Sequence, residues 1–465
     1  MLSKTFFSGD IHFVGVGGVG MSGLARILKE LGYSITGSDT GSNFYTQGLE
    51  KIGIKISYVH SPENLKNAAC LVVSSAIALD NPEILEAKRM KIPIVHRSHI
   101  LYWIMKSRFS IAVAGSYGKT TTTSLIGHLL ENCGYKPTVI VGATINAKKT
   151  NAYLGEGEYC VVESDESDAS FLNLHPEISV VTAIDHEHLS TYGTFSKLMD
   201  FFYQFVTQVS FRGFSVLCID NGNVRSLADK ALKSGDCNRI ITCGLSLDSN
   251  VRAANIRYFK THCEYDAVFD VDWIGRFSLK NVRIDLIGEH NIKNSLAALS
   301  VMFGIKSVLH SNCFFGYQGV KRRCTIVGMY KDATIIDDYG VHPSAISQVI
   351  RTFKSDNYNL EGRLIVVWQP HRYSRVVNLV KEFSKAFSLA DKVYVTPIFS
   401  AWEQPTEGFS FEKFIYSTSA ESAYVESFYS LKENLDSQKL NNKDVILFFG
   451  AGDITTWAER LAKFD

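Results

Sequence analysis

A glycine-rich run that carries a lysine and a threonine is the clearest chemical signal in this 465-residue chain. It reads Ala-Gly-Ser-Tyr-Gly-Lys-Thr-Thr over residues 114–121, between an apolar strand-like stretch (110–113) and a helix-like one (122–130). Glycines let the backbone curl so that N–H groups face a phosphate, and the following helix adds its positive end. Lys119 offers a mobile positive charge, and Thr120 offers a hydroxyl for a magnesium ion. The run predicts a nucleoside triphosphate site made of Gly115, Ser116, Tyr117, Gly118, Lys119, Thr120 and Thr121.

The spacing of this run differs from the common phosphate loop, G-x-x-x-x-G-K-[ST]. Val113 stands where that motif has its first glycine, so what remains is a shorter G-x-x-G-K-T. The alternative is a glycine-rich turn between a strand and a helix that carries a lysine by chance.

An acidic cluster follows the next strand-like segment. Glu163-Ser-Asp-Glu-Ser-Asp168 comes directly after the apolar residues 159–162. The carboxyl ends of strands in a doubly wound sheet face the ligand, and magnesium prefers oxygen ligands of this kind. A solvated acidic loop is the alternative, and it fits less well because the charges end a strand that looks buried.

Two histidines and two carboxylates end a further strand, in the sequence Ile184-Asp-His-Glu-His188. They indicate either a second metal site or histidines with structural hydrogen bonds. Zinc is not expected, because no third nitrogen or sulfur ligand is nearby.

A second glycine cluster lies near the N-terminus. Residues 15–20 match G-x-G-x-x-G between a strand and a helix, and Asp39 follows at about the 20-residue distance typical of dinucleotide sites. A pyrophosphate on the helix N-terminus would fit either NAD or a sugar nucleotide, whereas tight glycine turns also serve packing. The glycines concerned are Gly15, Gly17, Gly18 and Gly20.

Polar groups in the second half of the chain offer further ligand contacts. Asn291 and Asn294 share one face of a predicted helix, where they would read a base edge or, as we favour from the sequence alone, act as a helix cap. Arg372 and Arg375 are three residues apart and would clamp a carboxylate or phosphate, unless they form a surface basic turn.

The length predicts about three domains, and strands alternate with helices in a way typical of covered parallel sheets. We expect an α/β fold with a Rossmann-like N-terminal domain (1–106), a central ATP-binding domain (107–316) and a doubly wound C-terminal domain (317–465). Leu101–Phe109 is expected to be a connecting helix, and residues 251–287 alternate as antiparallel strands do. A helix is also predicted over Pro82–Met90, and strands are predicted over Leu364–Trp368 and Lys392–Val395.

Composition narrows the class of protein. The net charge of +1 gives no sign of a nucleic-acid partner, and no apolar run approaches the roughly 18 residues of a membrane span. Gly9-Asp10 interrupts the N-terminal segment before a secretory core can form. The nine cysteines include no C-x-x-C pair, so a reducing cytoplasm is the expected location.

Taken in order, the motifs resemble those of the Mur ligases of peptidoglycan synthesis, over essentially the whole chain. The matching segments are G-x-G-G-x-G-M-S-G, G-S-x-G-K-T-T-T-T, E-x-D-E-S-D-A-S-F, E-H-L-x-x-Y, H-N-x-x-N, D-D-Y-G-x-H-P, Q-P-H-R-Y-S-R and G-A-G-D-I. Two of them, D-D-Y-G-x-H-P and Q-P-H-R-Y-S-R, are typical of the branch that adds L-alanine to UDP-N-acetylmuramate. The shorter phosphate loop is also the form that this family uses.

The resemblance implies an ATP- and Mg²⁺-dependent ligase that forms an acyl phosphate on UDP-N-acetylmuramate and transfers it to L-alanine, as a monomer or homodimer in the cytoplasm. It implies catalytic roles for Lys119, Glu163, His188, Arg323 and Asp338. It implies magnesium contacts for Thr120, Glu163 and His188, and ATP contacts for the phosphate loop, Asn291, Asn294, Arg322, Arg323 and Asp338. It implies substrate contacts for Gly15, Gly17, Gly18, Gly20, Asp39, Ser74, Ser75, His342, His371, Arg372 and Arg375.

Five positions depart from the family pattern. Ala183 stands where Asn is usual, and Tyr117 stands where His is frequent. Asp185 and Glu187 are acidic as in the family, but the shorter and the longer acidic residue have changed places. Val341 replaces the first His of Y-G-H-H-P and so removes one polar contact near the nucleotide or amino acid. This change either relaxes the preference for alanine or has no such effect because His342 alone provides the contact.

The sequence alone leaves three rival functions open. One is the sibling ligase that joins a whole peptide to the same sugar nucleotide during recycling. Another is a nicotinamide dehydrogenase, which would leave Lys119 and the acidic cluster unexplained. The third is a nucleotide-binding regulatory protein that has lost turnover.

Overall fold

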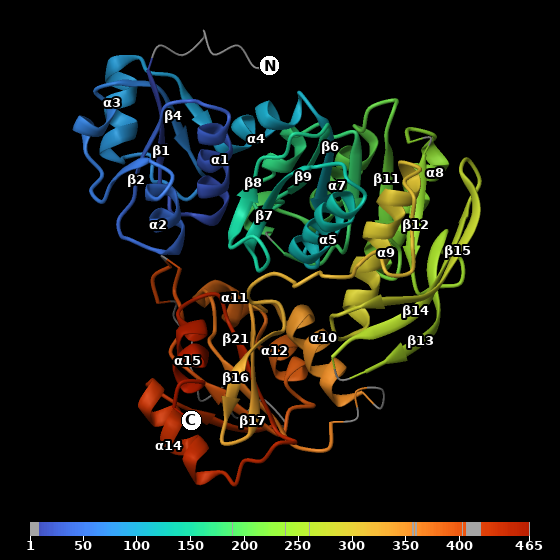
Figure 1. Cartoon of the computed structure of the whole chain (residues 1–465). Coiled ribbons are helices and arrows are strands. Elements are labelled where there is room, and N and C mark those ends of the chain that lie inside the picture. The colour runs from blue at the N-terminus through green and yellow to red at the C-terminus, as the bar shows by residue number, and fades with distance from the viewer. Residues whose placement is uncertain are drawn as a thin grey trace. The chain divides into compact units, whose positions relative to one another are not determined.

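The computed structural model describes residues 9–187, 189–237, 239–259, 261–355, 358, 360–401, 403–405 and 420–464. It has the predicted three-domain α/β fold, with a sheet in each of three successive parts of the chain (Figure 1). By their contacts the described residues form two compact units. The first contains the described residues up to 256 with 265–284 and 291–318, and the second contains 257–264, 285–290 and the residues from 319 onward.

The N-terminal sheet has five parallel strands in the order β3-β2-β1-β4-β5. The strands are β1 (Asp10–Val14), β2 (Ile35–Ser38), β3 (Lys55–Ser57), β4 (Ala68–Val73) and β5 (Ile94–His96). Its helices are α1 (Val19–Glu30), α2 (Phe44–Glu50), α3 (Pro82–Met90) and α4 (Arg97–Met105), with a short 3-10 turn, η2 (Pro62–Leu65).

The central sheet has ten strands in the order β15-β14-β13-β12-β11-β10-β6-β9-β7-β8. Its parallel centre consists of β6 (Phe109–Ala114), β9 (Tyr159–Glu163), β10 (Ile178–Val181), β11 (Phe214–Cys218) and β12 (Ile240–Gly244). The outer strands are β7 (Thr138–Ile145), β8 (Thr150–Tyr153), β13 (Val251–Tyr258), β14 (Cys263–Val271) and β15 (Gly275–Ile284). The helices are α5 (Lys119–Asn132), η3 (Ser170–Asn173), α6 (Leu189–Tyr192), α7 (Phe195–Thr207), α8 (Gly222–Ser234) and α9 (Glu289–Gly304).

The C-terminal sheet has six strands in the order β16-β17-β21-β18-β19-β20. Among the strand pairs that the structure describes in this sheet, the edge pair β16–β17 is antiparallel and the others are parallel. The strands are β16 (Thr325–Tyr330), β17 (Ala333–Asp338), β18 (Leu364–Trp368), β19 (Lys392–Val395), β20 (Glu421–Tyr424) and β21 (Val445–Phe449). The helices include α10 (Pro343–Lys354), α11 (Tyr373–Asn378), α12 (Val380–Ala386), α14 (Phe428–Ser437) and α15 (Ile454–Leu461).

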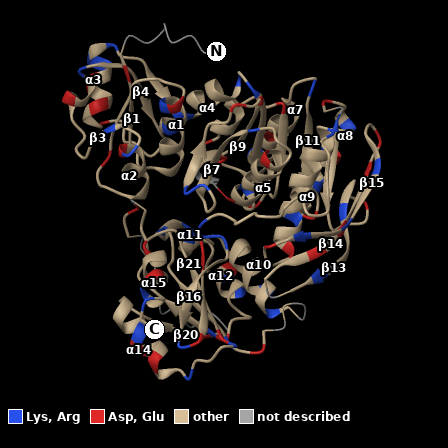
Figure 2. Cartoon of the chain, in the orientation of Figure 1, with Lys and Arg blue, Asp and Glu red and all other residues tan. Residues whose placement is uncertain are grey.

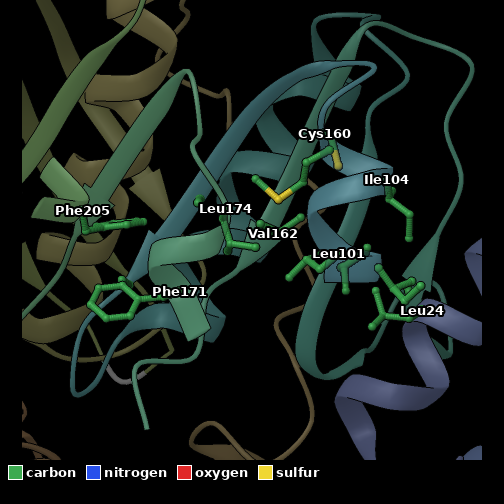
Figure 3. Packing of buried hydrophobic residues seen from close by; sticks show 14 of the residues in the cluster. Leu24, Leu101, Ile104, Cys160, Val162, Phe171, Leu174 and Phe205 are labelled. Carbon is green, nitrogen blue, oxygen red and sulfur yellow. The ribbon is translucent and has the colours of Figure 1, made fainter. Parts of the chain in front are cut away.

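One hydrophobic cluster joins the N-terminal and central sheets within the first unit. Figure 3 shows Leu24 of α1 beside Leu101 and Ile104 of α4, and the cluster continues to Cys160 and Val162 of β9. Helix α1 packs against β7 and β8 of the central sheet. The two sheets therefore share a core, which fixes the edge of one sheet relative to the other.

The helix expected over 101–109 is shifted. Helix α4 begins at Arg97 because the His96 side chain accepts a hydrogen bond from the Ser98 backbone N–H and so caps the helix. It ends at Met105, and Phe109 already pairs with Tyr159 as the first residue of β6.

Lys and Arg residues are interspersed with Asp and Glu over both units (Figure 2). Among the described residues, no helix is both long enough and apolar enough to span a membrane.

Candidate active site

The phosphate loop lies between β6 and α5, and its two glycines are required by geometry. Gly115 has φ of 130° and Gly118 has φ of 84°, values that side chains disfavour. A Cβ at Gly115 would lie 2.5 Å from Thr182 Oγ1, and a Cβ at Gly118 would lie 2.6 Å from Asn294 Oδ1. The loop is thus packed against the residues after β10 and against α9.

Helix α5 begins at Lys119, three residues earlier than the apolar pattern predicts. Gly118 supplies the left-handed N-cap, and the buried residues Thr120–Thr123 are helical although they are β-branched. The first N–H groups of α5 have no partner within the helix, so its positive end faces the loop.

Lys119 pairs with Glu166, a member of the predicted acidic cluster whose partner the sequence did not indicate. Its Nζ donates to Glu166 Oε1 at 2.9 Å and to the Gly115 carbonyl. Burial disfavours the charged lysine, but the carboxylates of Glu166 and Glu163 outweigh this and raise the pKa of Lys119. Burial raises the pKa of Glu166 to about 7. A triphosphate at this loop would compete with Glu166 for the lysine.

Thr120 and Glu163 fit a magnesium ion. Thr120 Oγ1 lies 3.0 Å from Glu163 Oε1, and Glu163 Oε2 accepts from the Gly142 N–H at 2.6 Å. Adjacent oxygens on an octahedral ion with bonds of 2.0–2.1 Å are about 2.9 Å apart, so both oxygens suit one Mg²⁺. In the part of the chain that the structure describes, no group of three or more His, Cys, Asp or Glu is placed to hold a metal. Such an ion would therefore rely on phosphate and water oxygens as well, as is usual for Mg²⁺.

The segment after β10 contributes mainly backbone atoms. The Ala183 carbonyl accepts from the Ser116 N–H at 2.8 Å, and Thr182 donates to the Tyr117 carbonyl. The change from the family's Asn to Ala183 leaves that backbone contact in place. His186 is exposed and stacks on Phe195 with ring centroids 3.9 Å apart. The predicted metal residue His188 lies outside the described residues.

Asn294 lies against the phosphate loop, and Asn291 lies beside Asn294. Helix α9 begins at Glu289, so the prediction that Asn291 caps it is wrong. Asn294 donates to Asn291 Oδ1 at 3.2 Å and accepts from Thr122 Oγ1 at 3.3 Å, and both asparagines are buried. Contact of this pair with a base remains a prediction.

The first glycine cluster and Asp39 are joined directly. The Gly17 N–H donates to Asp39 Oδ2 at 2.7 Å. A Cβ at Gly17 would lie 2.6 Å from Asn43 Nδ2, and Gly15 has φ of 71°. Gly18 precedes α1 without a side-chain cap, so the N–H groups of that helix face the loop as anion binding requires.

Ser74 and Ser75 follow β4. The Ser74 carbonyl accepts from the Ile77 N–H at 3.1 Å, which forms a turn. The Ser75 hydroxyl donates to Asp168 Oδ2 at 2.6 Å and lies 3.1 Å from His96 Nε2. The predicted substrate residue Ser75 thus touches the acidic cluster of the central sheet.

In the second unit, Arg322 and Arg323 precede β16, and Asp338 is the last residue of the neighbouring strand β17. Asp338 is buried and accepts from the N–H groups of Cys324 at 2.9 Å and Gly340 at 2.7 Å. The Arg322 guanidinium donates to the carbonyls of Gly450 and Ala451 and lies over the Tyr339 ring. The guanidinium carbon of Arg323 is 5.3 Å from the centroid of the Tyr339 ring.

The remaining predicted residues of this unit lie after β17 and β18. His342 caps α10 by accepting from the Ser344 N–H at 3.3 Å, and the half-buried Val341 precedes it. His371 Nδ1 is 2.7 Å from Arg375 Nη1. Burial together with Arg375 and Arg372 lowers the pKa of His371 to about 3, so this histidine is neutral. A neutral histidine with two guanidinium groups would suit an anionic ligand.

Family models match nearly the whole chain in the order of the three sheets. They are described as Mur ligase family, catalytic domain, over residues 10–109; Mur ligase middle domain, over 113–302; and Mur ligase, glutamate ligase domain, over 322–452.

Similar proteins agree with these matches. A UDP-N-acetylmuramate–L-alanine ligase of Rickettsia bellii is 41% identical over 461 residues, which cover 97% of this chain and 95% of that protein. The crystal structure of the UDP-N-acetylmuramate-alanine ligase of Thermotoga maritima superposes with a TM-score of 0.80 at 26% identity and covers 98% of both chains. A murein peptide ligase of Psychrobacter arcticus shares the fold, with a TM-score of 0.69 at 20% identity over 98% of both chains. With three family models over its three sheets and relatives that match it along nearly its whole length, the chain belongs to the Mur ligase family.

Proposed function

We propose that this chain is an ATP-dependent ligase that joins L-alanine to the carboxylate of UDP-N-acetylmuramate. The observation that carries the proposal is the arrangement of Lys119, Thr120 and Glu163 at one edge of the central sheet. The substrates are those of the relatives at about 41% identity, whose lengths this chain covers almost completely.

The chemistry of the proposal is activation of an inert acid. A carboxylate oxygen attacks the γ-phosphorus of ATP, ADP leaves, and an acyl phosphate forms. The alanine amine, after losing a proton, then attacks the carbonyl carbon, and the tetrahedral intermediate expels phosphate. The product is an amide, with one ADP and one phosphate released for each bond formed.

Residues of this chain would position the reactants and neutralise charge during these reaction steps. Lys119 would leave Glu166 for the β- and γ-phosphates, and the N–H groups of the loop and of α5 would hold the phosphate oxygens. Thr120 and Glu163 would hold Mg²⁺, which would neutralise charge on the phosphates. Water would destroy an acyl phosphate, so a site closed to solvent is required during turnover.

The sugar nucleotide would bind at the N-terminal sheet. The Gly15–Gly20 loop and the start of α1 suit a pyrophosphate, with Asp39 and Ser75 beside them. Because this loop is explained by a sugar nucleotide, no NAD is needed. ATP and nucleotide sugars are metabolites of the cytoplasm, where we place this reaction.

An acceptor assay tests the proposal against the recycling ligase. The chain is incubated with UDP-N-acetylmuramate, ATP and Mg²⁺, together with L-alanine, glycine, L-serine or a cell-wall tripeptide, and the products are separated by chromatography. We expect product with L-alanine and much less with the tripeptide. Product from the tripeptide alone would assign the chain to recycling, and no product with any acceptor would contradict a ligase.

A further inference from the structure

A polar cluster within the first unit links the acidic loop of the central sheet to the edge of the N-terminal sheet. Arg97 Nη2 lies 2.8 Å from Asp165 Oδ2 and 3.5 Å from Asp168 Oδ2. Ser75 donates to the same Asp168 oxygen at 2.6 Å, and His96 Nε2 lies 3.5 Å from it. Ser75 follows β4, His96 is the last residue of β5 and Arg97 comes next, so all three lie at the carboxyl ends of the strands, where the glycine loop also lies.

The same acidic loop reaches the phosphate loop within a few residues. Glu166, next to Asp165, accepts from Lys119 Nζ at 2.9 Å, and its carbonyl accepts from the Tyr192 hydroxyl. The Glu166 side chain is only 3% exposed, so its position depends closely on the backbone that carries it. A change at Asp165 or Asp168 would therefore alter how Lys119 is held.

Arg97 also lies beside the first glycine cluster. A Cβ placed on Gly20 would be 3.7 Å from Arg97 Nη1. The side chain of Arg97 is 17% exposed, so part of the guanidinium can be reached from solvent. One guanidinium thus contacts the acidic loop and borders the helix end that would hold a pyrophosphate.

From these contacts we propose that Arg97 and Asp168 are positioning residues that couple occupation of the sugar-nucleotide site to the release of Lys119 for ATP. The proposal rests on the proposed function. An anionic ligand at the glycine loop would compete with Asp165 and Asp168 for the Arg97 guanidinium, and a ligand hydroxyl at Ser75 would compete with Asp168. The acidic loop then holds Glu166 less firmly on Lys119, so ATP binds more tightly.

The coupling has a defined thermodynamic signature. A ligand shifts a conformational equilibrium only through its different affinity for the two states, and the coupling between two ligands is reciprocal. UDP-N-acetylmuramate should tighten binding of a non-hydrolysable ATP analogue by about 5-fold or more, and the analogue should tighten binding of UDP-N-acetylmuramate by the same factor.

The test is calorimetric binding of the imido analogue of ATP with Mg²⁺, with and without saturating UDP-N-acetylmuramate. It uses the wild-type chain, Asp168→Asn, Arg97→Met, Arg97→Lys and the control Arg89→Met, whose exposed guanidinium pairs with Glu86 on α3. We expect coupling below about 2-fold in Asp168→Asn and Arg97→Met, because the link is broken. Partial coupling is expected in Arg97→Lys, and full coupling in the control. Melting curves check folding, and the nearly isosteric Asp168→Asn carries the test if Arg97→Met is unstable.

The outcomes separate the two claims. Full coupling in both Asp168→Asn and Arg97→Met, or no coupling in the wild type when both ligands bind, overturns this inference and leaves the proposed function intact. Failure of the wild type to bind UDP-N-acetylmuramate overturns the proposed function, and the inference with it.

Discussion

Lys119 shows how a single side chain depends on its setting. Its charge is retained in a buried place because three carboxylates surround it. We predict that Lys119→Ala lowers kcat for amide formation by at least about 10²- to 10³-fold, since the variant loses the positive charge that the lysine directs at the transferred phosphoryl group. Product formation under saturating substrates measures this. Lys148→Ala, which removes a half-exposed lysine paired with Glu131, should retain activity. Equal rates in wild type and Lys119→Ala would refute the role of the lysine.

His371 gives a pH prediction. Its folded pKa of about 3 lies below its ordinary value of 6.5, so the unfolded chain binds a proton that the folded chain does not. Stability from the neutral histidine is complete above pH 6.5 and is lost as the pH falls from 6.5 toward 3. Between pH 7.5 and 5.5, wild type should lose about 1.4 kcal/mol more than His371→Gln. Urea unfolding at both pH values measures the difference, and parallel losses would contradict the shifted pKa.

Single residues also show what the sequence can reveal. Lys119, Thr120 and Glu163 could be singled out because a glycine turn and a strand end mark them locally. The partnership of Lys119 with Glu166 and the position of Arg97 could not, because both arise from contacts between distant segments. The N-cap prediction for Asn291 failed because local preference places Asn at caps, whereas here Asn291 is buried within α9 and paired with Asn294.

At the scale of elements, the turn from β6 to α5 depends on glycine at two positions. Gly118→Ala would strain a left-handed residue and press a methyl group against Asn294. Gly134 is the matched control, with φ of 80° and open space around its Cβ position. We predict at least about a tenfold loss of ATP-analogue affinity, about 1.4 kcal/mol, in Gly118→Ala and unchanged affinity in Gly134→Ala. Equal affinities in the two variants would show that the loop tolerates a side chain.

Helix α3 is tied to the N-terminal sheet by the fully buried Glu83. Its carboxylate accepts from Ser38 at 2.7 Å and from Asn64 at 2.5 Å, with His12 3.6 Å away. Burial disfavours this charge, but His12, followed by Asn64 and Ser38, outweighs it and lowers the pKa of Glu83 to about 2. The stability that the carboxylate provides is thus present above its ordinary pKa of 4.5 and lost as the pH falls toward 2.

We predict that Glu83→Ala reduces the free energy of unfolding by about 2–4 kcal/mol at pH 7, because it breaks a buried network. Glu63→Ala, which removes an exposed carboxylate paired with Lys66, should change it by about 0.5 kcal/mol or less. Denaturant titration compares the two. Similar small effects would mean that the buried cluster does not stabilise α3.

The elements predicted best are those with a single strong pattern. The helix over Pro82–Met90 and the strands Leu364–Trp368 and Lys392–Val395 have the predicted bounds. Strand β16 was not expected, because it contains Gly328 and is half-exposed at the sheet edge. The start of α4 was missed because a histidine, an uncommon N-cap, begins it.

At the scale of the whole molecule, the order of motifs along the chain carries more information than any one of them. The first glycine cluster alone permits NAD, and the phosphate loop alone permits many nucleotide-binding proteins. The two motifs together, in a chain with three successive α/β domains, indicate the Mur ligase architecture. The arrangement of the two compact units during turnover is a property of the whole chain that local sequence patterns do not encode.

Isotope transfer tests most directly whether the site activates an acid with ATP. UDP-N-acetylmuramate with both carboxylate oxygens labelled with ¹⁸O is converted in the presence of ATP, Mg²⁺ and L-alanine, and the released phosphate is analysed by mass spectrometry. An acyl phosphate predicts one ¹⁸O atom in each phosphate and one in each amide carbonyl. Unlabelled phosphate released alongside a fully formed amide would contradict the account.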